Sequence, residues 1–275
     1  MITLIAMLHS MAAEPWSLRD DQPRRDGRAA MVVVTPGYEP EAFEPLAEAL
    51  GKRGLDVHVL SFACTPMDTA AMAEAMVEAA ARLEESPVVV AHGLGASLAL
   101  MAGDRLAASH LVLLGPAIAA WPSEAADLAA AITVGPQVDL GVSIDQWTTG
   151  RSIDPRPVLA FGGSDVASVL LGDSPPLQAC ASGPYAAEIQ QWYRQGGPPV
   201  ALDTIDTPVW IGVGLLDRLA PVEAVIPASR ELAQRELVRL GITRLDGRDF
   251  NHLDLLRERV PLRLAARAAR RGVRP

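Results

Sequence analysis

Two residues in the C-terminal part of the chain are candidates for acid–base chemistry. Asp217 follows an apolar run in PVWIGVGLLDRLAP, residues 208–221, and His252 lies 35 residues later in DFNHLDLL, residues 249–256. Carboxylates and imidazoles are the side chains that most often take part in proton transfer. The first of these stretches is typical of a strand that delivers an acid into a loop. These two residues are therefore the first candidates for a catalytic role.

Two earlier stretches also end an apolar run in a glycine turn. Residues 32–38 read VVVTPGY, and residues 87–99 read PVVVAHGLGASLA. The second is typical of a strand, a tight turn and a helix in succession. The chain thus contains four candidate pieces of a site, in the order glycine turn, strand–turn–helix, acid and histidine.

In this order, and at ordinary spacings, the four stretches resemble the α/β-hydrolase superfamily over nearly the whole chain. That family presents nucleophile, acid and histidine in the same chain order. The NHLD stretch is similar to the region around the catalytic histidine of acid lipases and related esterases. The resemblance implies that Asp217 orients and charge-stabilises His252, and that the backbone N–H groups of Leu94 and Tyr38 form an oxyanion hole.

The chain departs from the family at the nucleophile. The pattern G-x-S-x-G reads Ala-His-Gly-Leu-Gly over residues 91–95, so that Gly93 stands where the serine is expected. This removes the acyl-enzyme route. The family's turn has positive φ, which strains any side chain by about 1–3 kcal/mol and which glycine adopts freely. We therefore expect positive φ at Gly93, within reach of His252.

Three interpretations of Gly93 remain open at this stage. The turn is relaxed in a protein that has abandoned catalysis, or the lost side chain makes room for substrate beside His252, or the substitution was introduced to trap a ligand. If the base is intact, Gly93→Ser is expected to restore a weak esterase.

Several residues compete for roles in the site. Asp165, at the end of PVLAFGGSD, is an alternative acid, but it lies 87 residues before His252, whereas the 35-residue interval from Asp217 is near the family's usual one. Ser97 is a possible displaced nucleophile, although a small residue for close helix packing is the favoured interpretation. Cys64 has no base beside it and is interpreted as structural.

The elements that must position these residues are predicted from apolar runs. Uniformly apolar strands are expected at 31–35, 57–62, 87–91, 111–114 and 208–213. Such strands are buried on both faces, as in a parallel sheet covered by helices. The fold class is therefore α/β: an α/β-hydrolase fold with a mostly parallel central sheet, flanking helices and an inserted cap.

Helices are expected between the strands. A helix is predicted to be capped by Thr65, and another carries the apolar stripe Phe43, Leu46 and Leu50. A third runs from Pro221 to about 235. The last helix starts near His252 and carries seven arginines after position 256, which we interpret as a solvated face.

Residues 121–205 differ from the rest and are predicted to form the cap, with 1–120 and 206–275 as the hydrolase core. The segment holds nine of the 22 prolines and six of the 12 aromatic residues. As the roof of a pocket, it should contribute substrate contacts. The residues expected to bind substrate are Gly37, His92, Trp121, Trp147 and Trp192. The charge balance of the cap, nine acids against three arginines, disfavours a strongly anionic substrate.

Composition excludes several classes of partner. The formal charge of −9 argues against nucleic acid, and the two cysteines lie in no metal-binding pattern. From the cysteines we expect no metal. GLGAS lacks the spacing of a dinucleotide loop, so no nucleotide cofactor is expected, and no other cofactor is predicted. The apolar residues 1–15 are interpreted as a buried first strand. With no run long enough to span a membrane, we expect a cytoplasmic protein; its oligomeric state is left open.

Three functions are compatible with these residues. The leading hypothesis is proton transfer by His252, in which an enolate held by the oxyanion hole leads to isomerisation or epimerisation, elimination or cyclisation of a hydrophobic carbonyl compound. Natural-product pathways contain atypical superfamily members of this kind. The second hypothesis is hydrolysis by water that His252 activates. The third is a pseudoenzyme that binds a ligand without turnover.

Overall fold

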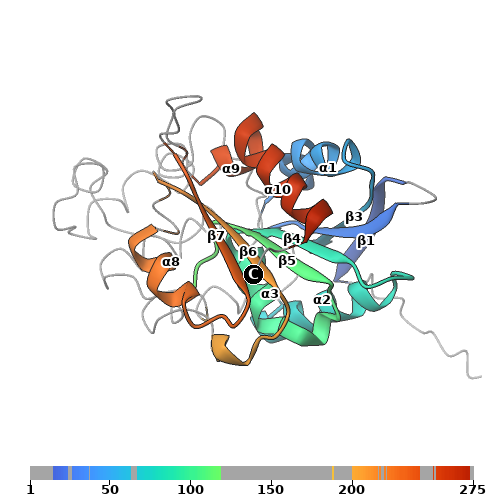
Figure 1. The fold of residues 1–275 in the computed structure, drawn as a ribbon. Coiled ribbons are helices and arrows are strands. Elements are labelled where there is room, and N and C mark those ends of the chain that lie inside the picture. The colour runs from blue at the N-terminus through green and yellow to red at the C-terminus, as the bar shows by residue number, and fades with distance from the viewer. Residues whose placement is uncertain are drawn as a thin grey trace, which may run out of the picture.

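A computed structural model describes the chain at residues 15–23, 27–36, 38–62, 67–118, 188, 200–215, 217, 220, 222–241, 250 and 252–272. In these residues the centre of the fold is a seven-stranded sheet with the order β1-β3-β2-β4-β5-β6-β7 (Figure 1). Only β1 runs antiparallel to its neighbour; the other pairs are parallel. The strands are β1 Trp16–Gln22, β2 Arg28–Val33, β3 Leu55–Phe62, β4 Val88–His92, β5 His110–Leu114, β6 Val209–Gly214 and β7 Arg235–Leu240.

The central strands are those with uniformly apolar sequences. Every residue of β4, β5 and β6 is buried, because helices cover both faces of the sheet at these strands. In parallel register, Val90 of β4 lies opposite Val32 of β2 and Val112 of β5. The five strands predicted from sequence are confirmed, with ends that differ by a few residues.

The two edge strands, β1 and β7, were not predicted. Their sequences, WSLRDDQ and RELVRL, carry charges, and most of their residues are only half-buried or exposed. Charged residues are usual on edge strands because they discourage pairing with other chains. One predicted helix is corrected as a result: α8 (Val222–Ser229) ends well before residue 235, where β7 begins.

Helices lie on both sides of the sheet. Figure 1 places α1 (Glu44–Gly51), α9 (Asp254–Arg257) and α10 (Arg259–Arg271) on one side, with α2 (Thr69–Ala81) and α3 (Gly93–Ala102) on the other. Short 3-10 helices complete the described elements: η1 Pro40–Phe43, η2 Gly103–Leu106 and η4 Leu202–Thr204. The result is a three-layer α/β arrangement.

The helix starts correct one sequence prediction and confirm another. α2 begins at Thr69, and its cap is Asp68, whose carboxylate accepts a hydrogen bond from the Ala71 N–H at 2.6 Å. Thr65 is therefore not the cap, because the closer aspartate satisfies the first turn. The expected stripe of Phe43, Leu46 and Leu50 is confirmed, since all three are fully buried.

Most of the predicted cap lies outside the described residues. Within it, Glu188 is described: its carboxylate accepts hydrogen bonds from the Thr69 N–H at 2.9 Å and the Thr69 hydroxyl at 2.6 Å. This contact joins the cap segment to the start of α2. Residues 1–14, Cys64 and Asp165 also lie outside the described residues, so the interpretations of them stay predictions.

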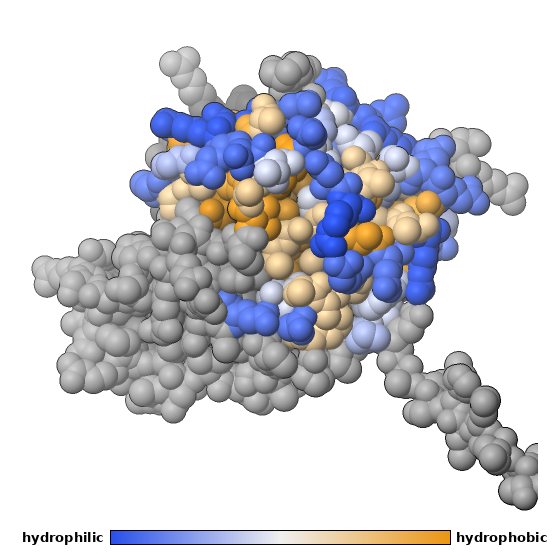
Figure 2. Space-filling model, turned by 90° about the horizontal axis from the view of Figure 1, so that it is seen from below, coloured by the Kyte–Doolittle hydropathy of each residue, from blue (hydrophilic) through white to orange (hydrophobic). Residues whose placement is uncertain are grey.

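One face of the molecule carries apolar areas between polar residues. Seen from below, hydrophilic residues surround areas of hydrophobic ones (Figure 2). Leu215, at 39%, is the one large apolar side chain exposed among the described residues. None of the helices in the described residues has the length and apolar character needed to cross a membrane.

Candidate active site

Asp217 and His252 form a buried hydrogen-bonded pair. His252 Nδ1 lies 2.9 Å from Asp217 Oδ2, and the two residues are 4% and 3% exposed. The other carboxylate oxygen, Oδ1, accepts a hydrogen bond from the Ala220 N–H at 2.8 Å. Because a carboxylate accepts from an N–H, the pair places the imidazole proton on Nδ1 and leaves the lone pair on Nε2. The contact predicted from sequence is therefore present.

The sheet brings the pair together. Asp217 follows β6, and its N–H donates to Gly214 O at 3.1 Å, which closes the turn at the end of that strand. The carboxyl ends of β4 and β5 lie at the same edge, because these strands are parallel and adjacent. Loops at this edge of an open α/β sheet are the usual place for a ligand site. His252 enters from the loop before α9.

Gly93 lies at the junction of β4 and α3 and has φ +54°, as the sequence predicts. A Cβ atom added at Gly93 would lie 2.9 Å from His252 Nε2 and 3.4 Å from its Cε1. Real Cβ atoms do not approach ring atoms at the shorter of these distances. A serine at this position therefore requires the end of the His252 side chain to shift, and the weak esterase expected of Gly93→Ser stays a prediction.

His92 is hydrogen-bonded to the backbone of His252. Its Nε2 lies 2.9 Å from the His252 carbonyl oxygen, and the two imidazole centroids are 4.1 Å apart. The Thr35 hydroxyl donates to the His92 carbonyl at 2.7 Å. Burial, and secondarily the neighbouring His252, hold the pKa of His92 well below its ordinary value, so this ring is neutral. His92 is fully buried; its expected contact with substrate stays a prediction.

The two predicted oxyanion donors differ in their surroundings. Leu94 is the second residue of α3, where backbone N–H groups have no acceptor within the helix and carry the positive end of its dipole. The N–H of Tyr38, in contrast, donates to Thr35 O at 3.0 Å and closes a turn after β2. The Tyr38 N–H thus already has an acceptor, and the oxyanion hole of Leu94 and Tyr38 stays a prediction. Gly37, the residue before Tyr38 in the sequence, lies outside the described residues.

The other residues expected to bind substrate, Trp121, Trp147 and Trp192, also lie outside the described residues. Ser97 is described, and its hydroxyl donates to Ala117 O at 2.8 Å inside the fold. It is fully buried, which agrees with its interpretation as a packing residue.

Gly115 was missed by the sequence analysis. It follows β5 with φ +54°, and an added Cβ would lie 2.6 Å from Asp217 Oδ2 and 3.0 Å from His252 Nδ1. The available signal was a glycine directly after a uniformly apolar strand, in HLVLLGPA. Its neighbours in space are about 100 and 137 residues further along the chain, so no local pattern reveals the contact.

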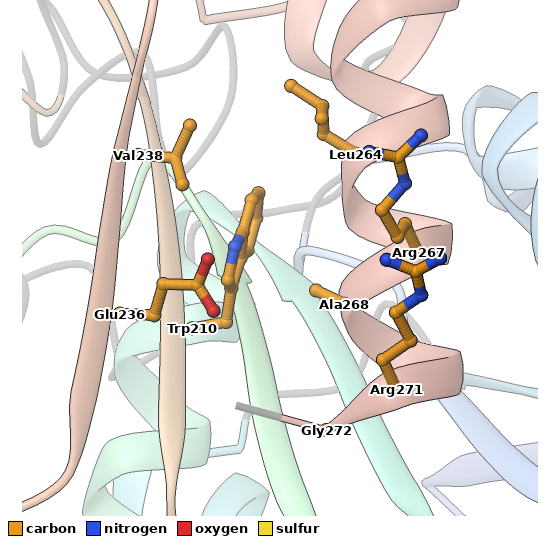
Figure 3. A pocket seen from close by; sticks show the side chains of 8 residues that line it. All are labelled: Trp210, Glu236, Val238, Leu264, Arg267, Ala268, Arg271 and Gly272. Atoms are coloured by element: carbon orange, nitrogen blue, oxygen red, sulfur yellow. The ribbon is translucent and has the colours of Figure 1, made fainter. Parts of the chain in front are cut away.

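A pocket of about 150 Å³ lies elsewhere, between the edge of the sheet and α10. Figure 3 shows Trp210 and Val238 of the strands facing Arg267 and Arg271 of the helix. Neither member of the Asp217–His252 pair lines it. The arginines on α10 are exposed, as a solvated face requires. No cluster of His, Cys, Asp and Glu suited to a metal ion occurs among the described residues.

A mostly parallel α/β sheet with a buried Asp–His pair at the carboxyl ends of its strands is typical of α/β-hydrolase folds. A sequence profile of the Alpha/beta hydrolase family matches residues 32–265. The chain therefore belongs to the alpha/beta hydrolase family and has its fold. No curated protein matches the chain.

Solved structures agree on the fold. A hydrolase from Pseudomonas aeruginosa PA01 is similar with a TM-score of 0.60 at 16% identity, over 94% of each chain. The monoacylglycerol lipase of Paleococcus ferrophilus has a TM-score of 0.56 at 17% identity, over 82% of this chain and 88% of that one. The meta-cleavage product hydrolase of Pseudomonas fluorescens IP01 has a TM-score of 0.59 at 15% identity, over 92% and 93%. At these identities the likeness concerns the fold.

Proposed function

We propose that the protein is an enzyme that transfers protons with His252 as its base and with no side-chain nucleophile at Gly93. The 2.9 Å hydrogen bond between His252 Nδ1 and Asp217 Oδ2 carries this proposal. It engages Nδ1 and leaves the lone pair on Nε2, which is the nitrogen nearest Gly93. A positioned base of this kind contributes about 10²–10⁴-fold to a rate.

The neutral state of His92 supports the same role. When His252 accepts a proton it becomes an imidazolium, and a second positive charge 4.1 Å away would oppose that step. The pKa of His92 is held low by burial, so this ring stays neutral while His252 is protonated. Asp217 supplies the compensating negative charge.

The reaction that suits these groups is removal of a proton next to a carbonyl. The resulting enolate oxygen would be stabilised by the Leu94 N–H at the start of α3, a contact worth about 3 kcal/mol per donor in comparable sites. Isomerisation or epimerisation, elimination and cyclisation all proceed through such an enolate. The aromatic, acid-rich sequence of residues 121–205 favours a hydrophobic substrate without strong negative charge, such as a natural-product intermediate.

Hydrolysis by water that His252 activates is the second candidate. Proteins of similar fold bear the names hydrolase, lipase and esterase, and a base that removes a proton from carbon can also remove one from water. This candidate requires no nucleophile at Gly93 either, so chemistry must separate the two.

A hydrophobic keto ester in D₂O tests both candidates in one reaction, because it carries an exchangeable C–H group and a cleavable ester. We expect deuterium to enter next to the ketone faster than without protein, with the ester left intact. Ester cleavage without deuterium incorporation would favour hydrolysis. Tight binding of such compounds with neither reaction would favour the pseudoenzyme and contradict the proposal.

A further inference from the structure

Two glycines contact the Asp217–His252 pair, one at each end of the imidazole. A Cβ at Gly93 would meet the Nε2 end of the ring, and a Cβ at Gly115 would meet the hydrogen bond at the Nδ1 end. We propose that Gly93 and Gly115 together form a glycine seat that positions the pair, and that neither position can carry a side chain while the pair keeps its geometry. The activity part of this proposal rests on the proposed function; its geometric part does not.

Gly115 is the stronger half of the glycine seat. An added Cβ would lie 2.6 Å from Asp217 Oδ2 and 3.0 Å from His252 Nδ1, so it would contact both atoms of the hydrogen bond. Contacts this short force one of the partners to move. A methyl group at this position therefore acts on the bond that fixes the imidazole tautomer.

The groups around Gly115 have little freedom to retreat. Asp217 is fixed by the Ala220 N–H on Oδ1 and by its own N–H on Gly214 O. Gly115 is itself fixed, because its N–H donates to Gly212 O at 2.8 Å on the neighbouring strand. Relief would thus require the His252–Asp217 bond to lengthen.

Positive φ alone would explain a glycine at either position. The effect of the contact with the pair must therefore be distinguished from the effect of positive φ. Gly103 provides the matched control. It has φ +52°, against +54° at Gly93 and Gly115, but an added Cβ there would meet its nearest atom, Ile205 Cγ1, at an ordinary 3.8 Å. Gly103→Ala and Gly115→Ala therefore both place a side chain at nearly the same positive φ, and they differ in the contact with the pair.

The test compares Gly115→Ala with Gly103→Ala by proton NMR, which needs no substrate. A hydrogen bond from an imidazole to a buried carboxylate gives a low-field N–H resonance, and the ring C–H signals report the titration of His252. We expect Gly103→Ala to keep both signatures of the unmodified protein. Gly115→Ala should lose or shift the low-field resonance and change the titration midpoint. The same spectra in both variants would overturn the proposal.

Gly93→Ala examines the other half of the glycine seat. Its methyl group would contact the Nε2 and Cε1 side of the ring. We expect the His252 Cε1–H signal to shift in Gly93→Ala and to stay in place in Gly103→Ala. An unchanged Cε1–H signal in Gly93→Ala would remove Gly93 from the seat.

A double variant keeps the test decisive if Gly115→Ala alone fails to fold. Asp217→Ala removes the carboxylate that the methyl group would strike. In that background we expect Gly115→Ala to lower the unfolding midpoint less than it does with Asp217 present. An equally large penalty would overturn the proposal, because the shortest contact, 2.6 Å to Asp217 Oδ2, would then not be its cause.

Activity then separates the seat from the proposed function. If the unmodified protein exchanges the keto ester proton, Gly115→Ala should lose at least about tenfold in rate, a part of what a positioned base contributes, while Gly103→Ala keeps it. If the NMR signatures change as expected but the unmodified protein exchanges nothing, the seat stands and the proposed function fails. Full exchange activity in a folded Gly115→Ala would contradict the positioning role.

Discussion

His252 is held so that one nitrogen of its ring remains available for chemistry. Nδ1 is bonded to Asp217, the carbonyl of His252 accepts from His92, and Gly93 itself places no side chain at the Nε2 end. A general base needs this combination of fixed orientation and available lone pair. These contacts suit His252 to accept a proton and to return it.

Asp217→Asn tests the orientation of the base. The amide of asparagine offers an N–H as well as an oxygen, so it can stabilise the wrong tautomer and remove the negative charge beside an imidazolium. We expect proton-exchange activity to fall by about 10²–10⁴-fold. Asp203→Asn, an exposed change in η4, is the control and should keep full activity. Equal activity in the two variants would remove Asp217 from the mechanism.

Gly93→Ser tests the claim that His252 occupies the space a side chain would need. The serine Cβ would lie 2.9 Å from Nε2, and positive φ adds strain of about 1–3 kcal/mol. We expect a lower free energy of unfolding and, because His252 must shift, only a weak release of nitrophenol from p-nitrophenyl butyrate, well below one equivalent in the burst. A burst equal to the enzyme concentration would reveal a working serine and would show that His252 adjusts freely.

At the scale of elements, the site depends on where the central strands end. β4, β5 and β6 are parallel and buried, so their carboxyl ends bring Gly93, Gly115 and Asp217 to one edge of the sheet. β5 is also fastened to α10, because His110 Nε2 lies 3.2 Å from the Ala268 carbonyl oxygen. The packing of α10 against β5 therefore contributes to the position of Gly115, which follows this strand.

His110 makes the free energy of unfolding depend on pH. Burial, and secondarily the charge of Arg28, lower the pKa of His110 to about 4. The unfolded chain, with an ordinary pKa near 6.5, then binds more protons between these values, so the free energy of unfolding should fall as pH drops from about 6.5 to 4. The loss is roughly 3 kcal/mol at most, since each pKa unit is worth about 1.4 kcal/mol.

Urea unfolding at several pH values checks this prediction. His110→Gln keeps an N–H donor for Ala268 and does not titrate. We expect its free energy of unfolding to change less between neutral and acid pH than that of the unmodified protein. The same slope in both proteins would assign the acid sensitivity to other groups, among them the neutral His92.

Sequence patterns predicted the elements that are apolar on both faces and missed those that are not. Uniform runs such as VVVAH predict buried strands without knowledge of their partners. β1 and β7 were missed because charged edge strands have no distinct pattern. The pairing of Asp217 with His252 followed from chain order, whereas Gly115 was invisible, since its role exists only once distant segments meet. The cap at Asp68 was missed because Thr65 offered a competing cap signal.

At the scale of the whole molecule, Asp104 anchors the segment that leads into β6. Its carboxylate accepts hydrogen bonds from the Thr207 hydroxyl and from the N–H groups of Thr207 and Asp206. Burial raises the pKa of Asp104, but these hydrogen bonds outweigh it and hold that pKa below its ordinary value. The segment that enters β6 is thus anchored to η2.

Asp104→Ala should lower the free energy of unfolding by roughly 1–3 kcal/mol, because it leaves the N–H and hydroxyl donors of buried Thr207 without an acceptor. The imidazole signals of His252 should stay unchanged, since Asp104 lies at the opposite ends of the strands. Chemical unfolding and NMR of the same sample check both parts. An altered His252 titration would show that the anchor also shapes the site.

The most direct test of the account is the rate of deuterium incorporation into a hydrophobic keto ester by the unmodified protein and by His252→Gln. Both proteins must first show the same unfolding midpoint, so that a loss of rate reflects chemistry. If His252 is the base, the unmodified protein incorporates deuterium next to the ketone, and the rate falls by about 10²–10⁴-fold in the variant. Undiminished incorporation by His252→Gln would contradict the claim that His252 is the base.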